Sequence, residues 1–72
     1  MDGMEHLTLE LEQEVDGRWL AEVTELPGVM AYGATDREAL DKTKALALRV
    51  LADRLEHGEI VPELREVFAL AR

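Results

Sequence analysis

The chain contains no cysteine, no serine and no asparagine, and its only aromatic residues are Trp19, Tyr32 and Phe68. Without cysteine it can form neither disulfides nor thiolate metal sites, and without serine it has no serine nucleophile. The three aromatic residues are not interleaved with lysine or arginine, as a base-stacking platform requires. These absences exclude several classes of enzyme and of nucleic-acid-binding protein.

Long hydrophobic runs are also missing. Residues 1–5 lack the basic start and apolar run of a secretory signal, and no apolar stretch approaches the length that spans a bilayer. No phosphate-cradling glycine loop occurs either. We therefore expect a cytoplasmic protein with no membrane partner and no cofactor.

Acidic residues outnumber basic ones by 16 to 8, which gives a formal net charge of -8. Proteins bind nucleic acids largely through Lys and Arg, which release counterions from the phosphates. We therefore expect no direct nucleic-acid binding. The acidic excess has two interpretations that the sequence leaves open, namely solubility and the attraction of a basic partner.

The small size of the chain limits its core. With 72 residues it is expected to form one domain over residues 1–72, and such a domain buries only about 60% of the surface that its unfolded chain exposes. Since no disulfide or thiolate metal site can compensate, oligomerisation is the remaining common device. We expect a homo-oligomer.

The first part of the chain has the pattern of a β-hairpin. Residues 6–15 alternate between leucines and mainly glutamates, as in a half-buried strand. Asp16-Gly17 indicates a turn, and Trp19, Ala21 and Val23 form an apolar row on the strand that follows. We interpret Trp19 as a core residue, with a partner contact as the alternative.

The length of the hairpin loop decides which side chains meet. A two-residue turn would place Leu11 opposite Glu22, whereas a three-residue loop with a left-handed Gly17 sets the leucines beside the apolar row. We favour the three-residue loop because it gathers the apolar side chains. It leaves Leu20 and Leu26 pointing to the other side of the sheet.

Pro27-Gly28 should end the second strand and turn the chain, because proline cannot donate a ladder hydrogen bond and glycine tolerates positive φ. Residues 29–34 are predicted to form a short third strand. Within it, Gly33 indicates a bulge or a close approach of another backbone.

A helix is predicted from residue 36 to about residue 57. Thr35 or Asp36 can cap its first turn, and Glu38 stands at capping-box spacing from Thr35. Gly58 suits the C-terminal end.

The predicted helix has an apolar arc that covers about half its circumference, which is wider than one sheet face needs. Leu46 and Leu48 lie near opposite borders of this arc. One border can therefore face the sheet and the other a second subunit, although a deeply seated helix explains the arc equally well. The candidate oligomer contacts are Leu46, Leu48 and Leu55. Residues 65–71, near the C-terminus, fit either a last strand or a helical turn.

Carboxylates could hold metal ions if they converged. The candidates are acidic side chains on the first predicted strand and in the predicted helix: Glu10, Glu12, Glu14, Glu38 and Asp41. If the leucines of that strand face the helix, its glutamates point the opposite way and the two groups stay apart. His6 and His57 have no recognisable ligand spacing. We expect no metal site, no catalytic residue and no enzymatic activity.

The segment from Trp19 to Leu40 resembles the HicB antitoxin family. There, a strand carrying an aromatic residue and an alanine runs into Leu-Pro-Gly, then into a short strand ending in Gly-x-Thr, then into a helix opening in Glu-Ala. The residues that match this order are Trp19, Ala21, Leu26, Pro27, Gly28, Gly33, Thr35, Glu38 and Ala39. Thr24 departs from the pattern, since many members have proline there.

The resemblance implies a small α+β domain of order β-β-β-α-β, similar to a truncated ribonuclease H fold, in which residues 65–71 form a fourth strand parallel to the first. Family members neutralise HicA, a small basic RNA-cleaving toxin, by docking over its RNA-binding surface. Most members also carry a C-terminal DNA-binding domain, and no such segment is expected here.

Two hypotheses for the function follow. The first is a non-enzymatic HicB-like module that docks on and neutralises a small basic HicA-like toxin, with Glu10, Glu12, Glu14 and Glu22 as candidate contacts. The second is an orphan HicB-like domain that persists as a homo-oligomer and binds a small ligand at a subunit interface. Gene neighbourhood would discriminate between them, because only the first needs a small basic companion.

Overall fold

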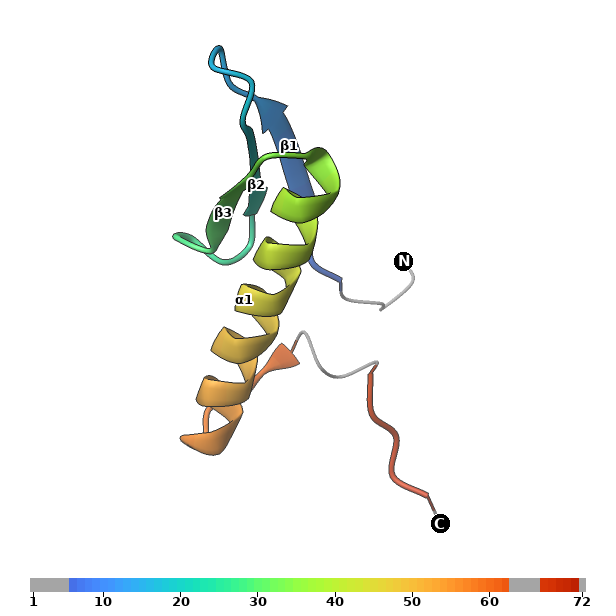
Figure 1. Cartoon of the computed structure of the whole chain (residues 1–72). Helices are drawn as coiled ribbons and strands as arrows, with labels where there is room; N and C mark the ends of the chain where they lie inside the picture. The colour runs from blue at the N-terminus through green and yellow to red at the C-terminus, as the bar shows by residue number, and fades with distance from the viewer. Residues whose placement is uncertain (1–5, 63–66, 72) are drawn as a thin grey trace.

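The computed structural model describes residues 6–62 and 67–71. Three strands are followed by one helix: β1 (Leu9–Gln13), β2 (Trp19–Val23), β3 (Met30–Gly33) and α1 (Asp36–Glu56). The strands form one antiparallel sheet in the order β1-β2-β3, and α1 lies across one face of it (Figure 1). The predicted α+β class is confirmed. No helix in the described ranges is both long and apolar enough to cross a membrane.

The hairpin between β1 and β2 has the three-residue loop that the sequence favours. The N–H of Glu14 donates to the carbonyl of Arg18 at 2.7 Å, and the N–H of Gly17 donates to the carbonyl of Glu14 at 2.9 Å. Gly17 has a φ of 94°, which lets the turn close into a bulge. The resulting register sets Leu9 opposite Val23, so the predicted pairing of the apolar rows is confirmed.

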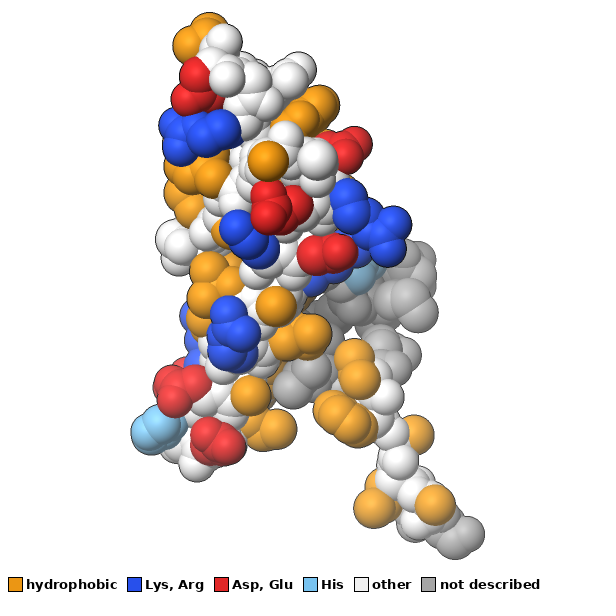
Figure 2. Space-filling model, in the orientation of Figure 1, with side chains coloured by type: hydrophobic (Ala, Val, Ile, Leu, Met, Phe, Trp, Pro, Cys, Tyr) orange, Lys and Arg blue, Asp and Glu red, His pale blue; other side chains and the backbone are white. Residues whose placement is uncertain are grey.

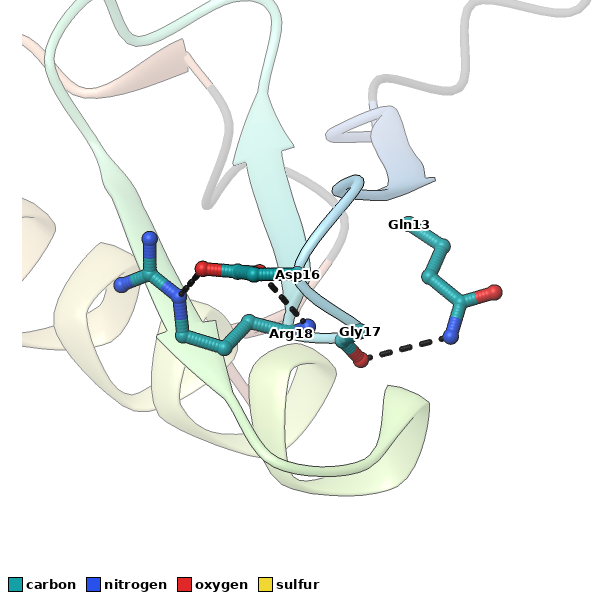
Figure 3. A network of polar contacts seen from close by, with 4 residues as sticks. All are labelled: Gln13, Asp16, Gly17 and Arg18. Carbon is teal, nitrogen blue, oxygen red and sulfur yellow. Dashed lines mark hydrogen bonds and ion pairs between the residues drawn. The ribbon is translucent and has the colours of Figure 1, made fainter.

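Side chains stabilise this loop (Figure 3). The Asp16 carboxylate accepts the backbone N–H of Arg18 at 3.0 Å and pairs with the Arg18 Nε at 2.8 Å. Both interactions favour the ionised carboxylate and lower the pKa of Asp16. Across the loop, the Gln13 amide donates to the carbonyl of Gly17 at 3.3 Å.

The Leu-Pro-Gly segment forms the predicted corner, but Leu26 does not point where the alternation placed it. Gly28 has a φ of 89°, and the N–H of Val29 donates to the carbonyl of Leu26 at 3.0 Å. β2 ends at Val23, so the two-residue alternation stops before Leu26. The Leu26 side chain is 1% exposed and belongs to the core, and the predicted outward orientation was wrong.

Thr35 is the N-cap of α1. Its hydroxyl oxygen accepts the N–H of Glu38 at 3.0 Å, as the capping-box spacing predicts. The Glu38 carboxylate accepts the N–H of Ala34, one residue earlier than the usual reciprocal bond. This hydrogen bond, helped by the charge of Lys42, lowers the pKa of Glu38.

The helix ends in a Schellman motif. Gly58 has a φ of 79° and donates its N–H to the carbonyl of Leu55 at 3.1 Å, while the N–H of Glu59 donates to the carbonyl of Arg54 at 3.0 Å. The predicted role of Gly58 is confirmed. The chain then turns back, and Val61 packs against the core.

The core lies between the sheet and α1. Its buried members come from β2, the corner and the helix: Val23, Leu26, Val29, Ala47 and Leu51. Partly buried residues surround them: Leu7, Leu9, Leu46, Val50 and Val61. Thr43 is the buried polar residue of the described chain, and its hydroxyl donates to the carbonyl of Ala21 on the central strand at 3.1 Å. This bond ties the helix to β2.

Gly33 allows the sheet and the helix to meet at backbone distance. A Cβ added at Gly33 would lie 2.4 Å from the Ala39 nitrogen and 2.9 Å from its Cα. The close backbone approach predicted for this glycine is confirmed. It sets the first turn of α1 directly against the end of β3, and α1 packs mainly over β3 and β2 and much less over β1.

The predicted fourth strand falls partly outside the described residues. Residues 65 and 66 are not described, and residues 67–71 are irregular and not part of the sheet. The fourth strand, and with it the truncated ribonuclease H topology, stays a prediction.

We predict that Gly33→Ala destabilises the domain by about 1–3 kcal/mol, because the new methyl group overlaps immovable backbone atoms. Urea unfolding followed by circular dichroism measures the loss. Gly17→Ala is the comparison, since its Cβ meets no atom within 4 Å and only the positive φ opposes it. An unchanged unfolding midpoint for Gly33→Ala would contradict the close approach.

Glu25 clamps the entry to β1, because its carboxylate accepts both the N–H and the hydroxyl of Thr8 at 2.7 Å. These bonds, the hydroxyl first, lower the pKa of Glu25 from 4.5 to about 2. The ionised form is the one favoured by folding, so this contribution is complete above the unfolded value and disappears as the pH falls from 4.5 towards about 2.

We therefore predict that Glu25→Gln is less stable than the parent at neutral pH, and that the difference shrinks over this acidic range. Thermal unfolding at a series of pH values measures it. Glu59→Gln, at an exposed position after the helix, serves as the control and should follow the parent curve. A difference for Glu25→Gln that does not change with pH would refute the clamp.

Candidate protein-binding surface

The sheet has one face that α1 does not cover. The register places side chains of all three strands on it, and we call this group the outer sheet face: Glu10, Glu12, Leu20, Glu22, Met30 and Tyr32. Leu20 lies here as predicted, opposite Glu12 on one side and Tyr32 on the other. Three of the four predicted contact glutamates are thus brought together, while Glu14 lies beyond the end of β1 in the hairpin.

Like charges face each other on this surface. Glu10 and Glu22 are directly opposite in the β1–β2 register, an arrangement that destabilises a sheet because the carboxylates repel. The ion pairs of the described residues involve other groups: Asp16, Arg18, Arg37, Glu38, Asp41, Lys42, Asp53 and His57. The negative charge of the outer sheet face is therefore not neutralised by the described part of the chain.

Apolar side chains that were not predicted from the sequence accompany these glutamates. Met30 is 41% and Tyr32 is 43% exposed. The Arg18 guanidinium lies over the Tyr32 ring, 4.3 Å from its centroid, and holds it in place by a cation–π contact. The two-residue alternation through β2 and β3 could have predicted this, because it places Met30 and Tyr32 on the same face as Glu22.

The glutamates and Leu20 surround a shallow depression. Its volume is about 420 Å³, and it is lined by Glu10, Leu11, Glu12, Leu20 and Glu22. A depression lined by three carboxylates and two leucines fits a cationic side chain that has an aliphatic stem, such as lysine or arginine.

The helix side of the molecule differs from the outer sheet face. Over α1, acidic and basic side chains alternate with hydrophobic ones (Figure 2). Arg37 pairs with Asp41 at 3.4 Å, and Lys42 pairs with Glu38 at 3.6 Å. These helix carboxylates lie on the layer opposite the strand glutamates, as the alternation predicts. No group of three or more potential metal ligands occurs among residues 6–62 and 67–71.

A second, apolar surface lies between α1 and β1. This groove has a volume of about 310 Å³ and is lined by Leu7, Leu9, Val23, Lys44, Ala47 and Leu48. Of the three candidate oligomer contacts, Leu46 packs against the core of its own chain. Leu48 borders the groove and is 62% exposed, and Leu55, one heptad further along α1, is 54% exposed. One border of the apolar arc of α1 therefore packs in the core, and the other border is exposed to solvent.

The residues of the family-like segment support this arrangement and do not form a site. Ala21 and Ala39 are fully buried, and Trp19 is half-buried beside Gly33. Pro27-Gly28 and Thr35 fix the two ends of β3 by the corner and the cap described above. Comparison with known proteins adds no relative: no protein-family model, curated protein or solved structure matches the chain.

We predict that Glu22→Gln stabilises the isolated protein by about 0.2–1 kcal/mol, because it removes one partner of the repelling pair. Unfolding in urea at low and at high salt measures the gain, which should be larger at low salt, where screening is weak. Glu59→Gln makes the same change in net charge away from the sheet and should give a smaller gain. A loss of stability in Glu22→Gln would mean that the carboxylate supports the fold.

Proposed function

We propose that this protein is a non-enzymatic, HicB-like antitoxin-type module that binds and neutralises a small basic RNA-cleaving toxin in the cytoplasm. The observation that carries the proposal is the outer sheet face, where Glu10 and Glu22 are directly opposite each other and the ion pairs of the described residues include neither. Such an arrangement costs the isolated protein stability, and we infer that a basic partner offsets this cost on binding. The resemblance of residues 19–40 to HicB antitoxins names the class of that molecule.

The surface suits a basic protein better than a small cation. The acidic excess steers a positively charged partner and accelerates encounter. Leu20 on the central strand and Met30 and Tyr32 on β3 then provide apolar contact beside the glutamates, and aromatic residues commonly supply much of the binding energy of an interface. Arg18 holds the Tyr32 ring in place before binding, so little side-chain freedom is lost.

A lysine or arginine of the toxin would enter the depression between the glutamates. If that residue belongs to the RNA-binding surface of the toxin, docking there blocks access of RNA. Neutralisation would then need contact alone, with no chemical step and no cofactor.

The test begins with the gene neighbourhood and uses the product of an adjacent gene for a small basic protein; the absence of such a gene would favour the orphan hypothesis. We predict salt-sensitive association in calorimetric titration, together with loss of the basic protein's ribonuclease activity as this protein is added. The double variant Glu10→Lys/Glu22→Lys should weaken binding at least tenfold, because it places positive charges against a basic surface. The double variant Glu56→Lys/Glu59→Lys is the matched control, because it makes the same change in net charge at two exposed positions away from the sheet, and it should bind nearly as well as the parent.

Three results would count against the proposal. One is equal weakening by the control and by Glu10→Lys/Glu22→Lys, which would show that the outer sheet face is not the contact. Another is binding of tRNA or duplex oligonucleotides by the isolated protein at physiological ionic strength, seen as retardation on a gel. The third is metal-dependent RNA cleavage by the purified protein itself.

A further inference from the structure

The last described residues form an apolar segment whose hydrophobic side chains are exposed to solvent. We call residues 67–71, Val-Phe-Ala-Leu-Ala, the C-terminal arm. Val67 is 63%, Phe68 is 71% and Leu70 is 88% exposed. The arm carries no charged residue in a chain of net charge -8, and β-branched and aromatic residues begin it. Such a stretch is suited to pair as a strand once it finds an apolar surface.

The C-terminal arm does not lie on the sheet of its own chain. It extends away from the sheet, towards the end of the molecule where α1 has its C-terminal half (Figures 1 and 2). The radius of gyration is 14.3 Å, whereas a compact domain of this length has about 11 Å. The hydrophobic side chains of the arm therefore stand apart from the core that they could complete.

β1 is an edge strand of the described sheet, and a further strand can pair with it. On the β2 side, the carbonyl of Thr8 accepts the N–H of Thr24 at 3.1 Å, and the N–H of Glu14 donates to the carbonyl of Arg18 at 2.7 Å. The alternation of an antiparallel pair then directs the N–H and C=O groups of Leu9, Leu11 and Gln13 to the other side. The described sheet ends at β1, so no described strand accepts these groups. An open edge of this kind pairs readily with another chain.

The apolar groove lies directly beside this open edge. Leu9 lines the groove, Leu11 follows it on the same face of β1 and is 39% exposed, and Leu48 closes the groove from the helix. Lys44 is the charged residue in its lining. A strand added to β1 would place alternate side chains into the groove, which needs apolar residues of the size of those in the C-terminal arm.

Charge limits where two copies of the chain can meet. Two copies would repel each other through their outer sheet faces, since both present glutamates there. The groove and the C-terminal arm are the described surfaces with little negative charge, and every copy carries both. A pair of chains can therefore exchange arms symmetrically, with two equivalent contacts closing the dimer.

We propose that the protein forms a dimer in which the C-terminal arm of each copy adds as a strand to β1 of the other and covers its apolar groove. The exchange completes each core with hydrophobic side chains of the partner copy. It leaves the outer sheet face free, so it is independent of the proposed toxin binding.

Thiol cross-linking on the full chain distinguishes exchange from docking within one chain. The chain has no natural cysteine, so the double variant Leu11→Cys/Leu70→Cys carries the only two thiols. With a short bifunctional maleimide at low protein concentration, exchange gives a product of twice the 8.1 kDa of one chain on a denaturing gel. An internally linked single chain, or no specific product, would overturn the proposal. Val15→Cys/Leu70→Cys is the control, because Val15 is at the distant hairpin tip.

Light scattering with unlabelled variants provides the second measurement. The parent should have twice the mass of one chain, and Phe68→Asp should shift to the single-chain mass, because a carboxylate cannot enter the groove. Phe68 is exposed, so loss of folding does not confound the result, and circular dichroism checks this. Val15→Asp, the same kind of change at a fully exposed valine, should keep the dimer. A monomeric parent, or a dimeric Phe68→Asp, would overturn the proposal.

The two proposals fail separately. Glu10→Lys/Glu22→Lys should remain a dimer while losing the basic partner. Phe68→Asp should become a monomer while its outer sheet face still binds that partner. A dimer without toxin binding would contradict only the proposed function, whereas toxin binding by a monomeric parent would contradict only the exchange.

Discussion

One helix has to cover a sheet that is wider than the helix. An α-helix with its side chains is about 10–12 Å across, and strands are spaced by about 4.8 Å, so α1 cannot seal the faces of all three strands equally. Gly33 fixes where it lies by allowing the backbone of Ala39 to approach β3. Cover is therefore best over β3 and β2, and the inner face of β1 remains open. The groove beside Leu9 and Leu48 results from this geometry.

Local chemistry made much of the fold predictable from the sequence. The bulged hairpin at Gly17, the corner at Pro27-Gly28 and the helix end at Gly58 depend on backbone angles that few residues accept. The orientation of Leu26 was not predictable from alternation, because it depends on β2 ending at Val23. The choice of the Ala34 N–H by Glu38 was not predictable either, because the cap spacing does not specify which neighbouring donor is nearer.

The candidate surface was predictable only in part. Alternation placed Glu10, Glu12 and Glu22 on one face, and the structure agrees. Their neighbours Met30 and Tyr32 come from a strand whose register against β2 follows from the corner geometry and not from composition. The outer sheet face thus combines acidic groups with the exposed Met30 and Tyr32, whereas the groove beside β1 and the C-terminal arm are mainly apolar.

The buried hydroxyl of Thr43 affects the rotation of α1 about its own axis. An apolar arc that spans half of a helix would let that helix rotate about its own axis with little change in burial. The hydrogen bond from Thr43 to the Ala21 carbonyl is directional and selects a single rotation. That choice sends Leu46 inward and leaves Leu48 at the rim. The buried hydroxyl of Thr43 therefore helps to determine which leucines of α1 are buried and which are exposed.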